Sequence, residues 1–273
     1  MDETVTCTAD DGTPLAATMT GAGRPLILLA GGIDYRARGW DRVVHLLAGR
    51  RRIVRFERRF YRPELGDPFR WTMVDEAGDV AALARRLGVP VDLLGHSSGG
   101  VVALESLVRD GDLYGSAVVF EAPIVLDRPL GGPALDRARA SLAAGRPARS
   151  MATFFHDVVG LPSWSSWLGA LGVWAAPAYR RRIPGQLADL AAIDALGDRR
   201  PVYAQIAHPL LAIRGTTSPE HLGERMRSLA AVVPSTRSWV VEGSHGAQQQ
   251  QPDQFAEQIM TFLADQSDHR GSD

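Results

Sequence analysis

Short apolar runs and helix-spaced apolar positions alternate along most of this chain. Largely apolar runs at residues 25–29, 91–94, 116–120 and 210–213 are typical of strands buried on both faces. Between two of them, Val80, Leu83, Ala84 and Leu87 recur at the spacing of one helix face. This alternation predicts an α/β fold with a mostly parallel central sheet and helices on both faces.

Two stretches depart from the alternation. Residues 4–8 and 15–20 flank the turn sequence Asp10-Asp11-Gly12-Thr13-Pro14, which predicts an N-terminal β-hairpin. Residues 127–200 contain several helical segments broken by Pro and Gly, with no strand pattern among them. We therefore expect a core over 1–126 and 201–265, an inserted helical cap over 127–200, and a polar, disordered tail over 266–273.

Composition narrows the chemistry. All 30 basic residues other than histidine are arginine, so a lysine Schiff base or lysine base is excluded. The formal net charge of −1 provides no global attraction to nucleic acid or to an anionic membrane. Cys7 is the single cysteine, so no intrachain disulfide can form. The N-terminus is acidic and unlike a signal peptide, and no apolar run is long enough to span a membrane, so we expect a cytoplasmic protein. We expect its partner to be a small-molecule substrate, with no nucleic-acid or membrane partner. The sequence does not predict the oligomeric state.

The segment Gly95-His96-Ser97-Ser98-Gly99 carries the clearest chemical signal. It follows the apolar run at 91–94 and precedes a helix-like run from Val101 to Val108, so it places a G-x-S-x-G motif between a strand and a helix. In that setting Ser97 lies on a sharp turn, and the helix directs unpaired N–H groups toward negative charge beside the hydroxyl. The motif predicts a nucleophile elbow, with Ser97 as the nucleophile.

A serine hydroxyl needs a base, and His245 is the best-placed histidine for that role. It follows the final predicted strand in the sequence Gly243-Ser244-His245-Gly246, so it lies at the carboxyl edge of the sheet with Ser97. His96 is adjacent to the nucleophile, but we expect its side chain to leave the turn in another direction.

With this elbow, late histidine and helical insertion, the chain resembles the α/β-hydrolase fold family. It looks most like bacterial serine hydrolases whose acid follows the sixth strand, where this chain has Phe120-Glu121-Ala122-Pro123. The resemblance implies a Ser-His-acid triad. The usual aspartate position after the penultimate strand holds Ser218, which has no charge but is a good helix N-cap before Pro219. Glu121 is therefore our expected triad acid, and Glu220 is the competitor.

The same resemblance implies an oxyanion hole built from two backbone N–H groups. Ser98 follows the nucleophile and supplies one. The loop after the strand at 25–29 supplies the other, from Gly32 by resemblance, with Ile33 as the alternative because Ala30 replaces the family's usual histidine.

Aromatic residues are dense in the expected cap, which in this family roofs the active site. We expect most of them to form the cap's own core and a few to line an apolar pocket. The candidates for that pocket are Ile33, Phe154, Phe155, Trp164 and Trp167.

The leading hypothesis is a serine hydrolase that cleaves an ester, thioester or lactone of a small to medium apolar substrate through an acyl-enzyme, without a cofactor or metal. The alternative is a non-hydrolytic lyase or cyclase at the same site, performing elimination or decarboxylation, because this fold hosts both chemistries. A non-catalytic ligand-binding protein is the third hypothesis.

Overall fold

A computed structural model describes residues 3–88 and 90–270 of the chain. The chain divides into two compact units. Unit 1 comprises residues 1–57, 74–123 and 200–273, and unit 2 comprises residues 58–73 and 124–199.

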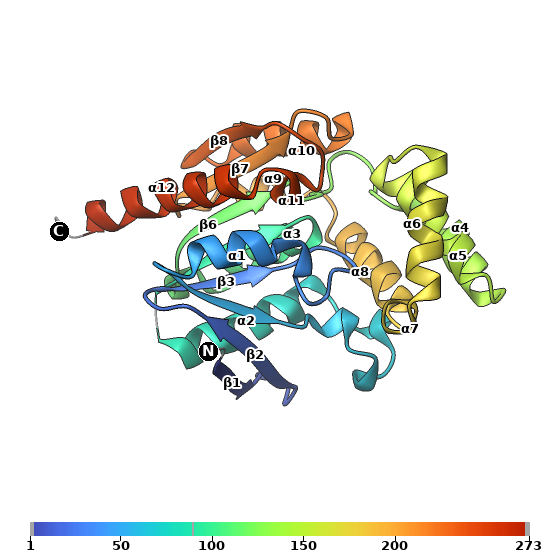
Figure 1. Cartoon of the computed structure of the whole chain (residues 1–273), viewed down its shortest axis with the longest axis horizontal. Coiled ribbons are helices and arrows are strands. Elements are labelled where there is room, and N and C mark those ends of the chain that lie inside the picture. The colour runs from blue at the N-terminus through green and yellow to red at the C-terminus, as the bar shows by residue number, and fades with distance from the viewer. Residues whose placement is uncertain (1–2, 89, 271–273) are drawn as a thin grey trace. The chain divides into compact units, whose positions relative to one another are not determined.

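Unit 1 is built on one eight-stranded sheet in the order β1-β2-β4-β3-β5-β6-β7-β8. Strands β1 and β2 form an antiparallel hairpin, β2 pairs antiparallel with β4, and all later pairs are parallel, as expected (Figure 1). The strands are β1 Glu3–Thr8, β2 Pro14–Thr20, β3 Pro25–Leu29, β4 Arg52–Phe56, β5 Val91–His96, β6 Tyr114–Phe120, β7 Leu210–Gly215 and β8 Thr236–Val241.

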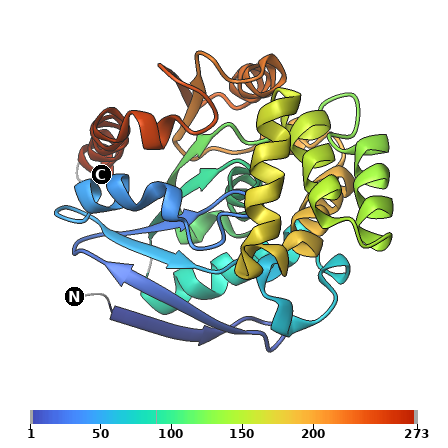
Figure 2. The ribbon, with the colours of Figure 1, turned by 45° about the vertical axis from the view of Figure 1, so that its right-hand side comes forward.

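Helices cover both faces of this sheet, as Figures 1 and 2 show. Helices α1 and α12 pack side by side on one face and share a core with side chains of β3, β5 and β6. Helix α3 packs against β3, β5 and β6. The helices of unit 1 are α1 Asp41–Leu47, α2 Met73–Leu87 (whose first residue belongs to unit 2), α3 Ser98–Asp110, α9 Arg200–Tyr203, α10 Glu220–Val232, α11 Ala247–Gln250 and α12 Pro252–Arg270.

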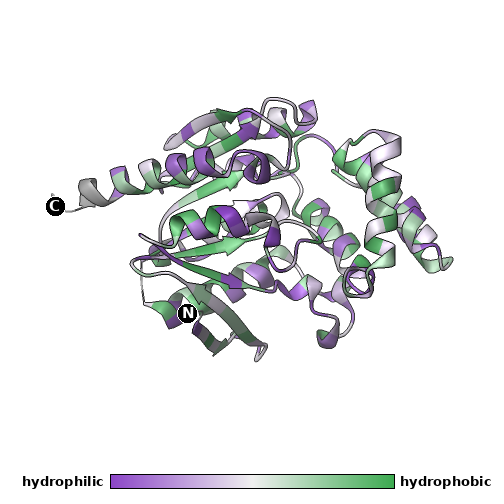
Figure 3. Cartoon of the chain, viewed as in Figure 1, coloured by the Kyte–Doolittle hydropathy of each residue, from purple (hydrophilic) through white to green (hydrophobic). Residues whose placement is uncertain are grey.

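The central strands are largely apolar, visible as green ribbon along β3 and β6 in Figure 3. Leu26, Ile27, Leu28 and Leu29 of β3 are at most 1% exposed. Burying each such side chain contributes about 1.5–3 kcal/mol. Central strands therefore read as continuous apolar runs, because both faces are covered.

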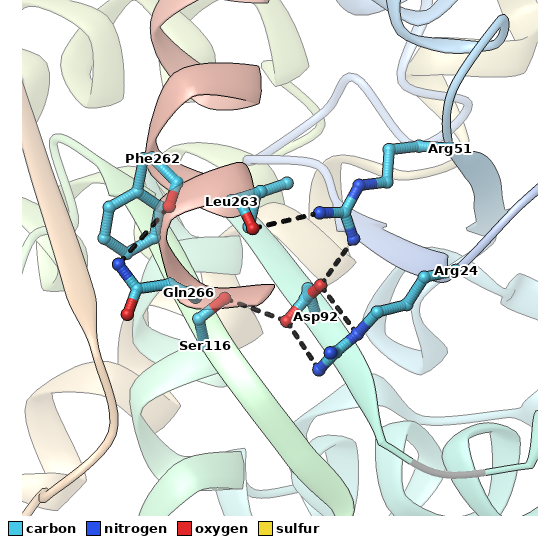
Figure 4. Close-up of polar contacts among 7 residues, drawn as sticks. All are labelled: Arg24, Arg51, Asp92, Ser116, Phe262, Leu263 and Gln266. Atoms are coloured by element: carbon cyan, nitrogen blue, oxygen red, sulfur yellow. Dashed lines mark hydrogen bonds and ion pairs between the residues drawn. The ribbon is translucent and has the colours of Figure 1, made fainter. Parts of the chain in front are cut away.

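A buried ion cluster on Asp92 of β5 ties the sheet to α12 (Figure 4). Arg24 and Arg51 both pair with the Asp92 carboxylate, and the Ser116 hydroxyl donates to it. Arg51 also donates to the carbonyl of Leu263 on α12. The carboxylate is 2% exposed, so its two guanidinium partners offset the cost of burying its charge.

Unit 2 is helical in all its described elements. Its helices are α4 Gly132–Ala143, α5 Pro147–Thr153, α6 Ser163–Ala175, α7 Pro177–Arg180 and α8 Ile183–Leu196, with a π-helical segment at Phe154–Val159. The buried carboxylate of Asp189 on α8 accepts from Arg58 and from the Tyr61 hydroxyl. These contacts attach residues 58–73, which we expected to belong to the core, to the helices of unit 2.

Helix α6 departs from the expectation that the aromatic residues form the core of the insertion. Its buried residues are the small Ser166 and Ala170, while Trp164 is 74%, Trp167 48% and Trp174 45% exposed. Small side chains allow α6 to pack closely in its own unit, and the large residues consequently project from the other side.

The boundary predicted at Gln266 also differs from the structure. Helix α12 continues to Arg270, past the start of the expected disordered tail, and residues 271–273 lie outside the described residues. A helix of 19 residues that is anchored by its apolar face extends through this polar end.

Candidate active site

Ser97 lies on a sharp turn between β5 and α3. Its backbone has φ 52° and ψ −128°, a conformation that residues other than glycine rarely adopt. The Ser97 N–H donates to the Phe120 carbonyl and the Gly100 N–H donates to the Ser97 carbonyl, and both bonds support the turn. A Cβ at Gly95 would lie 2.6 Å from the Gly100 Cα, and a Cβ at Gly99 would lie 2.1 Å from the Leu29 carbonyl oxygen. The motif therefore needs both glycines for space.

Glu121 directly follows the neighbouring strand β6 and also has a positive φ, of 47°. Its side chain is fully buried. The Glu121 N–H donates to the Ile213 carbonyl, and the Gly215 N–H donates to Glu121 Oε1 at 2.8 Å. One carboxylate oxygen is thus held by the backbone at the end of β7, which leaves Oε2 for another donor.

His245 supplies that donor. Its Nδ1 lies 2.6 Å from Glu121 Oε2. An ionised carboxylate accepts hydrogen bonds, so this contact selects the tautomer with the proton on Nδ1 and leaves Nε2 as the basic nitrogen. The His245 side chain is 22% exposed while that of Glu121 is 0% exposed, so the pair joins a buried acid to an accessible base.

The competing acid Glu220 and the uncharged Ser218, which both follow β7, take other positions. Glu220 is exposed and pairs with Arg227, which lowers the Glu220 pKa. Ser218 does not cap α10: the N-cap residue is Pro219, and the Ser218 hydroxyl is buried without a hydrogen-bond partner in the described residues. The N-cap of α10 therefore lies one residue later than the sequence suggested.

An aromatic cluster surrounds the His245 ring. The His96 ring centroid lies 4.7 Å and the Phe120 centroid 5.9 Å from that of His245. His96 Nε2 lies 3.1 Å from the His245 carbonyl oxygen. The expectation that His96 turns away from the site is therefore wrong. The sequence could have indicated this, because side chains two residues apart on a strand point to the same face of the sheet. His96 therefore shares with Leu94 the face that carries α1 and α12.

The loop after β3 lies directly against the elbow. A Cβ at Gly31 would be 2.5 Å from the Ser97 Cβ and 2.7 Å from the His96 carbonyl oxygen. The Gly32 N–H, one of the two expected oxyanion donors, donates to Ser98 Oγ at 3.1 Å. An oxyanion would compete with this hydroxyl for the Gly32 donor. The assignment of Gly32 over Ile33 stays a prediction.

The expected pocket residues divide between the units. Ile33 is half-buried in unit 1, whereas Phe154, Phe155, Trp164 and Trp167 belong to unit 2. Phe154 and Phe155 are half-buried and pack edge to face at 5.7 Å. That any of these residues binds substrate stays a prediction.

The part of the chain that the structure describes contains no cluster of three or more His, Cys, Asp or Glu side chains arranged to hold a metal ion. Among residues 3–88 and 90–270, no helix combines the length and apolar character that a membrane crossing requires.

Comparison with known proteins identifies the family and the fold. Residues 26–258 match the sequence model described as "Alpha/beta hydrolase family". An alpha/beta hydrolase from Sphaerobacter thermophilus superposes with a TM-score of 0.74 at 25% identity, covering 95% of this chain and all of that one. An esterase from a Rhodococcus species gives 0.70 at 23% identity, covering 96% of this chain and 98% of its own. A bromoperoxidase from Bacillus anthracis gives 0.70 at 20% identity, covering 96% and 100%.

Proposed function

Because the chain belongs to the alpha/beta hydrolase family, we propose that it is a serine hydrolase that cleaves an ester, thioester or lactone through an acyl-enzyme on Ser97. The observation that carries this proposal is the 2.6 Å contact between His245 Nδ1 and the buried Glu121 Oε2. A base oriented by a buried carboxylate, in a loop beside a serine elbow, is the arrangement that serine activation requires.

The proposed reaction begins when His245 Nε2 takes the proton from Ser97 Oγ as that oxygen attacks the substrate carbonyl. The C=O bond opens to an oxyanion, which the Ser98 N–H and a second N–H from the Gly31–Ile33 loop stabilise. The imidazolium on His245 is stabilised by Glu121 and gives its proton to the leaving alcohol or thiol. The C–O or C–S bond breaks, and the acyl group remains on Ser97.

Water completes the cycle. His245 removes a proton from water as the water oxygen attacks the acyl carbon, and the proton then returns to Ser97 Oγ as the carboxylic acid leaves. Removing one oxyanion donor in enzymes of this type typically costs ~10²–10³ in kcat, so the identity of the second donor matters to the rate.

The test is labelling by a fluorophosphonate, which phosphonylates only an activated serine. We expect wild type to be labelled and Ser97→Ala not to be. Loss of labelling in Ser97→Ala together with turnover in a panel of esters, thioesters and lactones supports hydrolysis. An unlabelled wild type contradicts the activated serine. A labelled wild type that turns over no acyl substrate favours the lyase or cyclase alternative.

A further inference from the structure

His96 makes two kinds of contact with His245. Its Nε2 lies 3.1 Å from the His245 carbonyl oxygen, so the Nε2–H donates to the backbone of the proposed base. Its ring also supports the His245 ring at a centroid distance of 4.7 Å and an interplanar angle of 43°. One side chain on β5 therefore holds both the backbone and the ring of a residue that lies 149 positions later in the chain.

The fold fixes His96 firmly. The side chain is 8% exposed, and its ring stacks on Phe120 at 4.9 Å with an interplanar angle of 12°. Trp40 contacts the same ring edge-on at 5.7 Å. Because these aromatic neighbours offer no charge, a protonated imidazole would be poorly solvated there. Burial accordingly holds the His96 pKa well below its ordinary value, and the neighbouring His245 lowers the pKa further.

The loop that carries His245 is held by hydrogen bonds on either side of that residue. It contains Gly243 with φ 129° and Gly246, and glycine backbones are conformationally permissive. The Gly243 and Ser244 N–H groups donate to Thr216 Oγ1 and Gln250 Oε1 at 3.1 and 3.3 Å. The carbonyls of the same two residues accept from the N–H groups of Thr217 and Ala247. The His96 bond is the contact that fixes the carbonyl of residue 245 itself from the buried side.

We propose that His96 is a positioning residue for His245. Its neutral Nε2–H and its ring fix the backbone and the ring plane of His245, so that Nδ1 faces Glu121 while Nε2 faces Ser97. This inference rests on the proposed function of His245 as the base. A neutral ring is the form that suits the role, because a second positive charge beside His245 would oppose the imidazolium that forms during attack. Misplacing a reacting group by about 1 Å can cost ~10²-fold in rate, so a lost bond at this point has measurable consequences.

The decisive comparison is His96→Gln against His96→Met. The two side chains have similar length and volume, but only glutamine carries an N–H that can reach the His245 carbonyl. We expect Met to lower kcat by ~10–100-fold with KM changed less than about 2-fold, and Gln to restore most of that loss. His96→Phe, which keeps a ring without a donor, should be impaired like Met. His45→Met, at an exposed histidine on α1, is the matched control and should behave as wild type.

A readout independent of turnover is the proton NMR signal of the His245 Nδ1–H held by Glu121. It should be lost to exchange in His96→Met and retained in His96→Gln, with circular dichroism showing that each variant is folded. If Met and Gln have equal kcat and equal spectra, the positioning role is wrong. If wild type itself is not labelled by fluorophosphonate, the proposed hydrolase function fails, and the NMR comparison still decides whether His96 orders His245.

Discussion

Ser97 and Glu121 directly follow the neighbouring parallel strands β5 and β6, and both have a positive φ, of 52° and 47°. His96 of β5 pairs in register with Phe120 of β6, so the two residues that follow lie at equivalent positions. The Ser97 N–H also donates to the Phe120 carbonyl, directly before Glu121. Strained backbone of this kind costs on the order of 1–3 kcal/mol per residue and is concentrated at functional sites. The two strained turns thus bring the proposed nucleophile and the proposed acid to one edge of the sheet.

Glu121→Gln should lower kcat by ~10²–10⁴-fold while preserving the fold. The amide nitrogen favours the wrong tautomer of His245 and leaves the imidazolium without a buried counter-charge. Glu220→Gln, at an exposed residue paired with Arg227, should change kcat less than about 2-fold. Steady-state kinetics on the best ester of the panel measures both. The opposite ranking of the two variants would mean that the acid assignment is wrong.

Moving the acid to residue 218 provides a gain-of-function test. Ser218 occupies the position where the family usually has its aspartate, and its hydroxyl is buried without a hydrogen-bond partner in the described part of the chain. We expect Ser218→Asp added to Glu121→Gln to recover at least ~10-fold of the lost kcat, because a carboxylate returns to the base. Ser218→Asn in the same background is the uncharged control and should recover none. Equal kcat in the Asp and Asn double variants would show that residue 218 does not reach His245.

Gly31→Ala should reduce kcat by more than ~10²-fold and lower the melting temperature. The new Cβ would lie 2.5 Å from the Ser97 Cβ and 2.7 Å from the His96 carbonyl oxygen, so either the oxyanion loop or the elbow must shift. Gly49→Ala is the matched control, since its Cβ would meet nothing within 4 Å. Kinetics and thermal melts compare the two variants. Wild-type kcat in Gly31→Ala would mean that the loop has room to move without affecting the site.

Most of the architecture could be predicted from the sequence because burial leaves a direct pattern. The apolar run at 25–29 is a strand with the predicted bounds. The segment 95–99 joins the end of β5 to the start of α3, as the strand–turn–helix pattern predicted. Both depend on local sequence: a strand buried on both faces is mostly apolar along its length, and a tight turn needs glycine where a Cβ would collide.

What could not be predicted depends on contacts between distant segments. Nothing local to residues 58–73 indicates that Arg58 and Tyr61 bind Asp189, more than 120 positions later. The same holds for His96, whose partner carbonyl is set by where β8 ends relative to β5. The exposed tryptophans of α6 were missed because an apolar helix gives no sign of which side packs when its small residues do the packing.

The buried His96 should also make the stability of the fold sensitive to acid. Its pKa is held well below 6.5 in the folded protein, chiefly by burial, while in the unfolded chain the imidazole titrates near ~6.5. Above that pH neither state binds the proton, and the full stability is present. As the pH falls below ~6.5, the imidazole binds a proton in the unfolded chain but not in the folded protein. The free energy of unfolding therefore falls by up to ~1.4 kcal/mol per pH unit.

Urea denaturation at pH 7.5 and pH 5.5 measures this loss. The difference in unfolding free energy between the two pH values should be smaller by about 1 kcal/mol in His96→Gln than in wild type, because glutamine does not titrate. Contributions from the other acidic and histidine side chains cancel in this comparison, and His45→Gln, at an exposed histidine, should keep the wild-type difference. An unchanged difference in His96→Gln would mean that His96 binds its proton equally in both states. That result would also remove the reason for treating its ring as neutral beside His245.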